Sequence, residues 1–138
     1  MAIVCILVII IGVSFWENAK NLQTIQKENK ELEDYQNRML YGTDVLSLIN
    51  KVDSINKKNE IPKDKDGKYI ANDTNSVIME IQLLNEGKLV SYSMESLQKA
   101  GTDKFIQGFN LTAFRLTKME YHSTTKKVAK LTVVQLEE

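Results

Sequence analysis

An uncharged apolar segment at the amino terminus constrains this chain more than any other feature. Ala2 to Trp16 is a run of 15 residues without a charge, and 13 of them are apolar. A helix buried in a globular protein has one polar face, so a helix that is apolar all round is typical of a membrane segment. Trp16 suits the membrane interface, and charged residues follow it. We therefore expect residues 1–16 to be a membrane anchor.

The anchor leaves two questions open. As a helix this run would cover roughly 22 Å, which is short of the ~30 Å hydrocarbon core. A cleaved secretory signal fits less well, because only Met1 and Ala2 precede the run and Val13 to Trp16 offers no small-x-small cleavage site. Orientation stays open, because acidic residues are interspersed among the lysines that follow and a removed basic leader would reverse the comparison.

Charge and composition exclude several classes of protein. Lys plus Arg is 18 and Asp plus Glu is 18, so the basic excess of a nucleic-acid binder is missing. One Cys permits no internal disulfide, and one His permits no histidine-rich metal site. Lys far outnumbers Arg, and Asn and Ile are frequent, a bias toward A/T-rich codons that indicates a low-GC bacterial genome.

Helical character continues beyond the anchor. An apolar stripe at spacings of three, four and seven predicts an amphipathic helix, unbroken to about Leu40; its members are Leu22, Ile25, Leu32, Tyr35 and Met39. We expect residues 17–41 to form a helical stalk. Its narrow apolar seam fits packing on its own domain as well as packing against neighbouring subunits.

A break is expected at Gly42, the only residue of low helix propensity between Trp16 and Ile55. Thr43 or Asp44 can cap the helix that follows. Val45 to Ile55 carries a wide apolar face that is suited to core contact. We expect Gly42→Ala to straighten the junction and impair assembly, with little loss of domain stability.

The rest of the chain reads mainly as sheet. Alternating apolar and polar residues predict four strands: Ser76 to Leu84, Leu89 to Tyr92, Phe109 to Tyr121, and Val128 to Leu136. The third strand changes phase between Leu116 and Met119, which predicts a bulge. Ser93 is expected to cap a short helix from Met94 to Ala100, and Thr102 to Gln107 to add another turn.

No motif in the chain specifies catalysis or metal binding. Asp64 to Gly67 resembles the middle of a calcium loop, but Pro62 would take the first ligand position, and a polar turn explains the same residues. His122 lies beside hydroxyl residues without a nucleophile elbow, so we expect an exposed turn histidine. We therefore expect no enzyme, with no catalytic, cofactor-binding or metal-binding residues and no cofactor.

An apolar amino-terminal helix, an amphipathic continuation and an antiparallel sheet together resemble the type IV pilin plan, which includes pseudopilins and the pilin-like proteins of tight-adherence systems. Most members have Glu at the fifth mature position, where this chain has Cys5 if Met1 is the start. The resemblance implies a minor or divergent pilin-like subunit of a bacterial surface filament or secretion apparatus. Its partners would be the lipid bilayer and other pilin-like subunits, including its own copies, contacted through the amino-terminal helix.

The expected fold is α+β. An apolar membrane helix continues into an amphipathic helix, which packs on an antiparallel sheet of about four strands. The expected organisation is an anchor over residues 1–16, a stalk over 17–41 and a small α+β domain over 42–138. The domain is expected to be extracytoplasmic, with neither nucleic acid nor an identified small molecule as a partner. The alternative function is a single-pass membrane protein whose domain binds a protein or ligand without polymerising.

Overall fold

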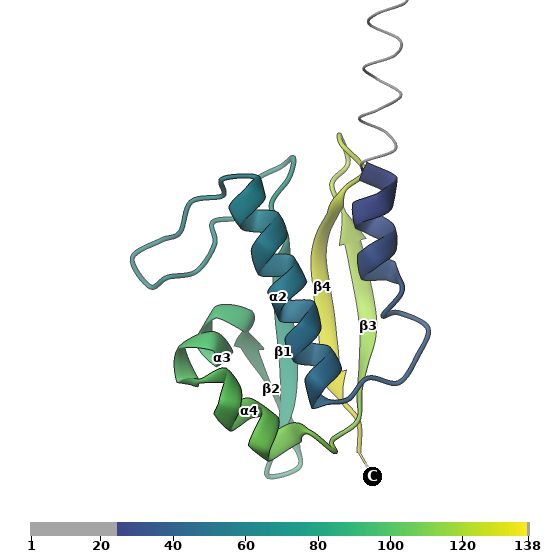
Figure 1. Cartoon of the computed structure of the whole chain (residues 1–138), viewed down its shortest axis with the longest axis vertical. Coiled ribbons are helices and arrows are strands. Elements are labelled where there is room, and N and C mark those ends of the chain that lie inside the picture. The colour runs from purple at the N-terminus through teal and green to yellow at the C-terminus, as the bar shows by residue number, and fades with distance from the viewer. Residues whose placement is uncertain (1–24, 138) are drawn as a thin grey trace, which may run out of the picture.

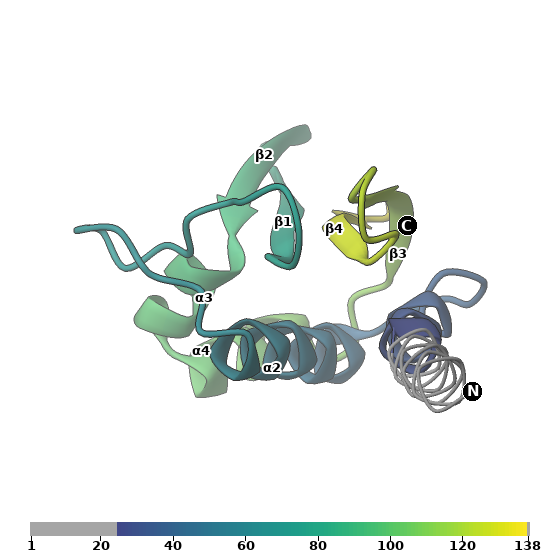
Figure 2. The same cartoon turned by 90° about the horizontal axis from the view of Figure 1, so that it is seen from above.

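The computed structural model describes residues 25–137. A first helix covers residues 25–33, and the chain then turns through residues 34–37. The elements that follow are α2 (Gly42–Lys58), β1 (Ile78–Asn85), β2 (Lys88–Ser93), α3 (Met94–Ala100), α4 (Thr102–Phe109), β3 (Phe114–Tyr121) and β4 (Val128–Gln135). The helices lie on one side of the sheet and leave its other face open (Figure 1, Figure 2). The expected anchor, residues 1–16, lies outside the described residues.

The four strands form one mixed sheet in the order β2-β1-β4-β3. Two antiparallel hairpins, β1–β2 and β3–β4, lie side by side. The central pair, β1 and β4, is parallel, with Met79 opposite Leu131 and Ile81 opposite Val133. The expectation of an antiparallel sheet is therefore wrong. The physical reason is the crossover: α3 and α4 carry the chain from one edge strand to the other, so β4 returns beside β1 in the same direction.

The predicted unbroken helix to Leu40 is also wrong. The helix stops at residue 33, where tighter bonds replace the helical ladder: the Tyr35 amide donates to the Leu32 carbonyl at 3.2 Å. Leu40 is instead extended and fully buried, and its amide and carbonyl both pair with Phe114, at 2.9 and 2.7 Å. Burying Leu40 while its backbone pairs with a strand requires extended backbone, so tertiary contacts override helix propensity here.

The expected membrane helix finds no counterpart in the described part of the chain. Among residues 25–137, no helix combines the length and the apolar character needed to cross a membrane. Together with the mixed sheet and the early end of the first helix, this finding corrects the expected fold to an α+β domain with a four-stranded mixed sheet.

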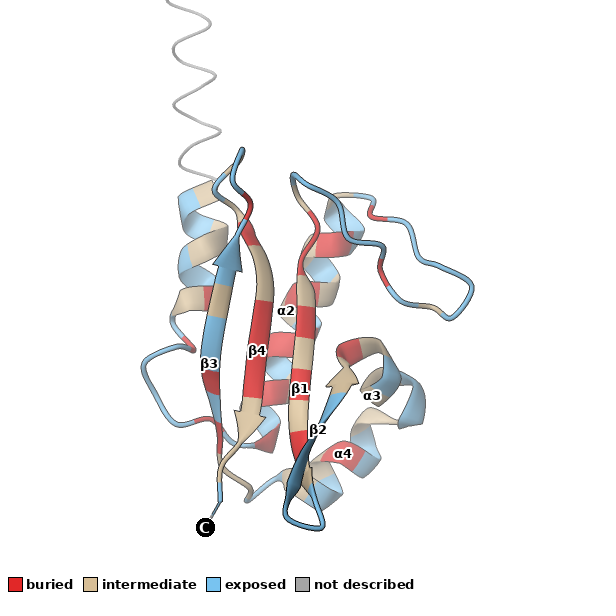
Figure 3. Cartoon of the chain, turned by 180° about the vertical axis from the view of Figure 1, so that it is seen from behind, coloured by how far each residue is buried: buried red, intermediate tan, exposed pale blue. Residues whose placement is uncertain are grey.

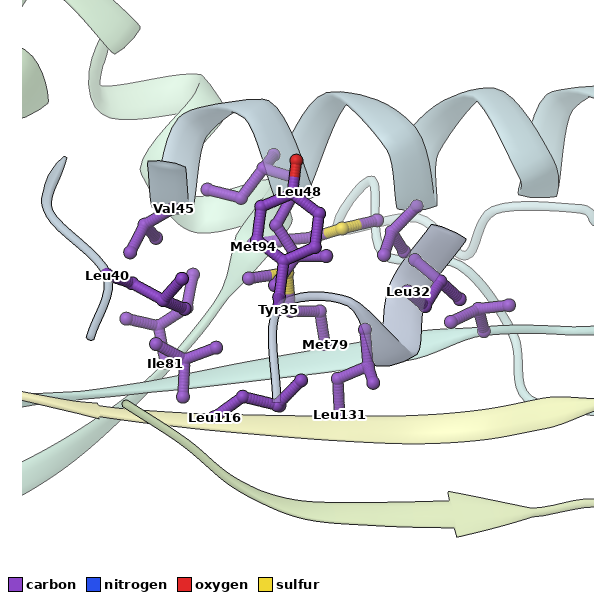
Figure 4. Close-up of a cluster of buried hydrophobic side chains, with 14 of the residues drawn as sticks. Leu32, Tyr35, Leu40, Val45, Leu48, Met79, Ile81, Met94, Leu116 and Leu131 are labelled. Carbon is purple, nitrogen blue, oxygen red and sulfur yellow. The ribbon is translucent and has the colours of Figure 1, made fainter. Parts of the chain in front are cut away.

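The core lies between α2 and the covered face of the sheet (Figure 4). Val45, Leu48 and Val52 of α2 are completely buried there, as the apolar face of Val45 to Ile55 predicts. The inward residues of β1 and β4 meet them from the sheet. Leu32 and Tyr35 join the same cluster, so this part of the seam packs on its own domain.

The start of α2 explains why the chain has a glycine at position 42. Gly42 is the first residue of α2 and is buried. A Cβ on this residue would collide with the carbonyl group of Phe109 and lie 3.0 Å from the Asn110 amide nitrogen. The break is confirmed near this position, but the role of Gly42 is close packing of α2 against the end of α4 rather than flexibility. The expectation that Gly42→Ala leaves the domain stable is therefore wrong.

Several local predictions are confirmed. The short helix runs from Met94 to Ala100, and the Ser93 hydroxyl accepts a bond from the Ser96 amide at 3.2 Å. β3 pairs with β4 through a register irregularity between Leu116 and Lys118, where the change of phase predicts a bulge. The predicted cap of α2 is wrong: the capping residue is Tyr41 rather than Thr43 or Asp44, and the Asp44 carboxylate accepts a bond from the Tyr41 amide at 2.9 Å.

Candidate functional site

A long hollow runs along the surface between the first helix and α2; we call it the helix groove. It consists of two adjoining hollows of about 460 and 340 Å³, which share Glu31, Ser54 and Ile55. The side chains around it are Lys27, Glu28, Glu31, Thr43, Leu46, Ser47, Asn50, Lys51, Ser54, Ile55 and Lys58. The groove follows α2 over most of its length, on the side away from the sheet.

The helix groove is mixed in character. Charges occupy the end near the last turn of α2, where the Lys58 ammonium lies 3.7 Å from the Glu28 carboxylate. Small polar side chains line the middle, and Leu46 and Ile55 supply its apolar surface. Such a surface can make reversible polar contacts with a protein segment. It offers no nucleophile held by a neighbouring base, which acyl-transfer chemistry would need.

Among the described residues, the shortest hydrogen bond between two side chains joins Tyr69 to Asp53. The Tyr69 hydroxyl donates to the Asp53 carboxylate at 2.6 Å, and Lys57 lies 3.0 Å from the same carboxyl group. Burial raises the pKa of Asp53, but the bonds from Tyr69 and Lys57 outweigh it and hold that pKa below 3.8. Burial and the bond to Asp53 raise the pKa of Tyr69 well above 10. The pair fastens the loop after α2 onto α2.

A similar contact joins the first helix to β3. The Tyr121 hydroxyl donates to the Glu33 carboxylate at 2.7 Å. Partial burial and this bond raise the pKa of Tyr121 to about 12. Tyr121 remains 46% exposed, so we interpret its bond to Glu33 as a surface contact that holds the first helix to β3, and not as a catalytic acid.

His122 lies in the turn after β3, as expected, but it is buried, contrary to the expectation of exposure. Its Nε2 lies 2.7 Å from the Ser76 carbonyl oxygen, so the ring joins the β3–β4 turn to the residues before β1. Alternation of apolar residues gives no signal for such a role, because the partner is a backbone atom 46 residues away.

Asp64 to Gly67 forms the polar turn that was the alternative to a calcium loop. The Asp64 carboxylate accepts bonds from the amides of Asp66 and Lys68, at 2.9 and 3.0 Å. These acidic residues and His122 thus have separate structural partners and do not share a site. Within residues 25–137, no three His, Cys, Asp or Glu side chains gather closely enough to hold a metal ion.

Two asparagines that sequence reasoning missed fix the helices to the sheet. Asn56 is fully buried, and its amide group donates to the Val77 carbonyl and accepts from the Val77 amide, both at 2.8 Å. Asn29 makes the same kind of double contact, donating to the Lys126 carbonyl at 2.9 Å and accepting from Val128 at 3.1 Å. Both lie among polar helix residues, so spacing does not mark them as buried.

The helix groove was missed for a related reason. It exists because the first helix ends at residue 33 and α2 runs beside it, whereas the sequence pattern predicts one helix to Leu40. Comparisons of the chain with protein-family models, with curated proteins and with solved structures give no match.

Proposed function

We propose that this chain is a non-enzymatic protein, held at a bacterial membrane by the apolar segment of residues 2–16, whose α+β domain faces outside the cytoplasm and contacts other proteins. The observation that carries the proposal is the attachment of the first helix to the domain. The helix over residues 25–33 follows the apolar segment by only eight residues in the sequence, and it is fixed to the domain by buried Leu32 and by the two bonds of Asn29. A tether joined in this way holds the domain close to the membrane.

Local chemistry supports a non-enzymatic role. The titratable side chains with the closest polar contacts, Asp53, Tyr69 and His122, each hold two segments of the chain together. A group that fastens the fold in this way is not free to exchange protons with a substrate.

Two forms of the proposal differ in whether the protein polymerises. A tethered binding domain is favoured by the position of α2, because α2 rather than the first helix covers the sheet, unlike the pilin plan in which the amino-terminal helix does so. A pilin-like subunit is favoured by the order of the chain, in which an apolar segment leads into a helix and then a sheet domain.

Vesicle flotation tests the tether. The full chain should float with phospholipid vesicles, and a chain without residues 2–16 should remain at the bottom of the gradient. Ile9→Lys tests the same segment without shortening the chain. A charge in the middle of the segment opposes insertion by about 2.5–3.5 kcal/mol, so this variant should also remain at the bottom of the gradient. A shortened chain that still floats would refute the proposal.

Electron microscopy of surface material sheared from cells separates the two forms. Filaments that contain this chain, and that disappear when residues 1–16 are deleted, would establish the pilin-like subunit. A detergent-extracted monomer or small complex from the same cells would establish the tethered binding domain.

A further inference from the structure

The two edges of the sheet differ in how well they are protected. The β3 edge is blocked where Leu40 pairs with Phe114, is distorted by the irregularity after Leu116, and carries a charged residue in Lys118. Pairing partners, bulges and charges are the devices that keep an edge strand from binding other strands. β2, on the opposite edge, has none of these devices along its length; its one charged residue, Lys88, is at its start.

Among the residues that the structure describes, nothing pairs with the outer edge of β2, and its backbone is regular. Its register with β1 runs without interruption from Asn85 opposite Lys88 to Glu80 opposite Ser93. Glu86 and Gly87 form the two-residue turn, with φ of 52° and 81°. The residues that flank a two-residue turn bond to each other, and pairing then alternates, so the amide and carbonyl groups of Leu89 and Ser91 point away from β1. Residues 88–91 are exposed, as Figure 3 shows from the open face.

A hollow of about 230 Å³ lies beside this edge. It is lined by Ile78 and Glu80 of β1, by Ser91 and Ser93 of β2, and by Lys130 of β4, with parts of Met79 and Tyr92. The Glu80 carboxylate lies 3.8 Å from the Lys130 ammonium, so the two charges at its rim neutralise each other. Because Ser91 and Ser93 belong to β2, the hollow adjoins the edge strand.

We infer that the outer edge of β2 binds an extended segment of a partner protein, which adds a fifth strand to the sheet and places an apolar side chain in the hollow over Ile78. Backbone pairing would supply affinity, and the hollow would supply selectivity for that side chain, as in other cases of strand addition. The occupant is an uncharged extended segment because the edge offers backbone donors and acceptors, and the charges at the hollow are already paired.

A second copy of this chain is not the occupant. Closed self-pairing of two β2 edges is antiparallel and uses a two-fold axis perpendicular to the sheet. That rotation would place the first helices (residues 25–33) of the two copies at opposite ends of the pair (Figure 1). Two copies held by one membrane through residues 2–16 cannot take this arrangement, an argument that rests on the proposed function.

The test uses the full chain in detergent micelles and an array of peptides of about ten residues that alternate Ser or Thr with single apolar residues. Ser91→Pro removes an outward amide and leaves the β1–β2 pairing intact. Ser91→Ala keeps the amide and should weaken binding much less than Ser91→Pro. Lys118→Ala, on the opposite edge strand β3, is the control that should leave binding unchanged. We expect binding of a subset of peptides, weakened about tenfold or more by Ser91→Pro and weakened when the apolar peptide residue becomes Gly.

Hydrogen exchange locates the contact. We expect the Leu89 and Ser91 amides to exchange quickly in the free protein and more slowly when peptide is bound. The Ser91 variants should have equal thermal unfolding midpoints, so that a loss of binding is not a loss of folding. Absence of any binding peptide, binding unaffected by Ser91→Pro, or protection only elsewhere would overturn the inference. So would dimerisation of the full chain through β2. Vesicle flotation is measured separately, so a result against membrane attachment is distinguished from a result against peptide binding at the β2 edge.

Discussion

At the scale of single residues, this fold depends on a few positions that hold segments far apart in the sequence together. Gly42 lets α2 approach the end of α4, and Asn56 completes the backbone bonds of Val77. Neither role could be predicted, because each depends on a backbone group more than 20 residues away along the chain. What sequence reasoning identified correctly at this scale was local: the Ser93 cap and the break in the helix near Gly42.

Gly42→Ala should destabilise the domain by about 1–3 kcal/mol, because the added methyl group collides with the Phe109 carbonyl and forces α2 and α4 apart. Gly108→Ala is the matched control, since nothing lies within 4 Å of its Cβ position in α4. That substitution should be neutral or stabilise by about 0.5 kcal/mol. Urea unfolding of both variants measures the difference. Equal stability of the two variants would contradict the packing role of Gly42.

The Asp53–Tyr69 pair should give stability a pH dependence. The pKa of Asp53 is lowered on folding, so its contribution is present above about pH 4 and is lost as pH falls through the folded pKa. The pKa of Tyr69 is raised on folding, so its contribution is present below about pH 10 and is lost as pH rises above it.

Tyr69→Phe removes the Tyr69 contribution and the part of the Asp53 contribution that the Tyr69 hydroxyl supplies, and it should cost about 1 kcal/mol at neutral pH. Urea unfolding at pH values from about 3 to about 11 should show the gap between this variant and the wild type narrowing at both ends. Tyr121→Phe is the control, because Tyr121 is 46% exposed and its loss should have a smaller effect. A gap for Tyr69→Phe that stays constant across the range would refute the coupling.

At the scale of elements, the alternation of apolar residues and the helix caps were the sequence features that predicted most of the secondary structure. They located α3, three of the strands and the bulge in β3, because these features depend on neighbours within a few residues. The third strand was predicted to begin at Phe109, but that residue ends α4 and β3 begins at Phe114. The first helix was predicted to be too long, because nothing in its own sequence opposes a helix at residues 34–40. Its end depends on Leu40 pairing with Phe114, a contact between segments 74 residues apart.

Asn56→Ala tests how α2 is joined to the sheet. The substitution leaves the buried amide and carbonyl of Val77 without partners, and each unpaired group costs about 1–3 kcal/mol. We therefore expect a loss of about 2–4 kcal/mol in the free energy of unfolding. Asn50→Ala, an exposed position on the same helix, should change it by less than about 0.5 kcal/mol. Similar losses for both variants would show that helix propensity, not the Val77 contact, is being measured.

At the scale of the whole molecule, the sequence pattern determines the hairpins and the buried face of each strand, but it does not determine the order of the strands in the sheet. Alternation tells which face of a strand is buried, and short turns tell which strands form hairpins. It does not tell how two hairpins are placed beside each other. The parallel pairing of β1 with β4 follows from the path of α3 and α4, and the unprotected β2 edge follows from the same path.

The relation of the first helix to the domain leads to a final prediction. Leu32 is 1% exposed and belongs to the core, and Asn29 completes the backbone bonds at the start of β4. Residues 25–33 are therefore part of the folded unit. A chain that begins at residue 34 should lose about 3 kcal/mol or more relative to one that begins at residue 25, because it lacks the buried Leu32 and the two hydrogen bonds of Asn29. Leu32→Ala in the longer chain should reproduce about 2–3 kcal/mol of that loss, whereas Glu31→Ala, at an exposed position one residue away, should have little effect. Denaturant midpoints of the four proteins measure these differences. Equal midpoints for the chains that begin at residues 25 and 34 would show that residues 25–33 are a separate stalk, and would remove the attachment of these residues to the domain on which the proposed tether depends.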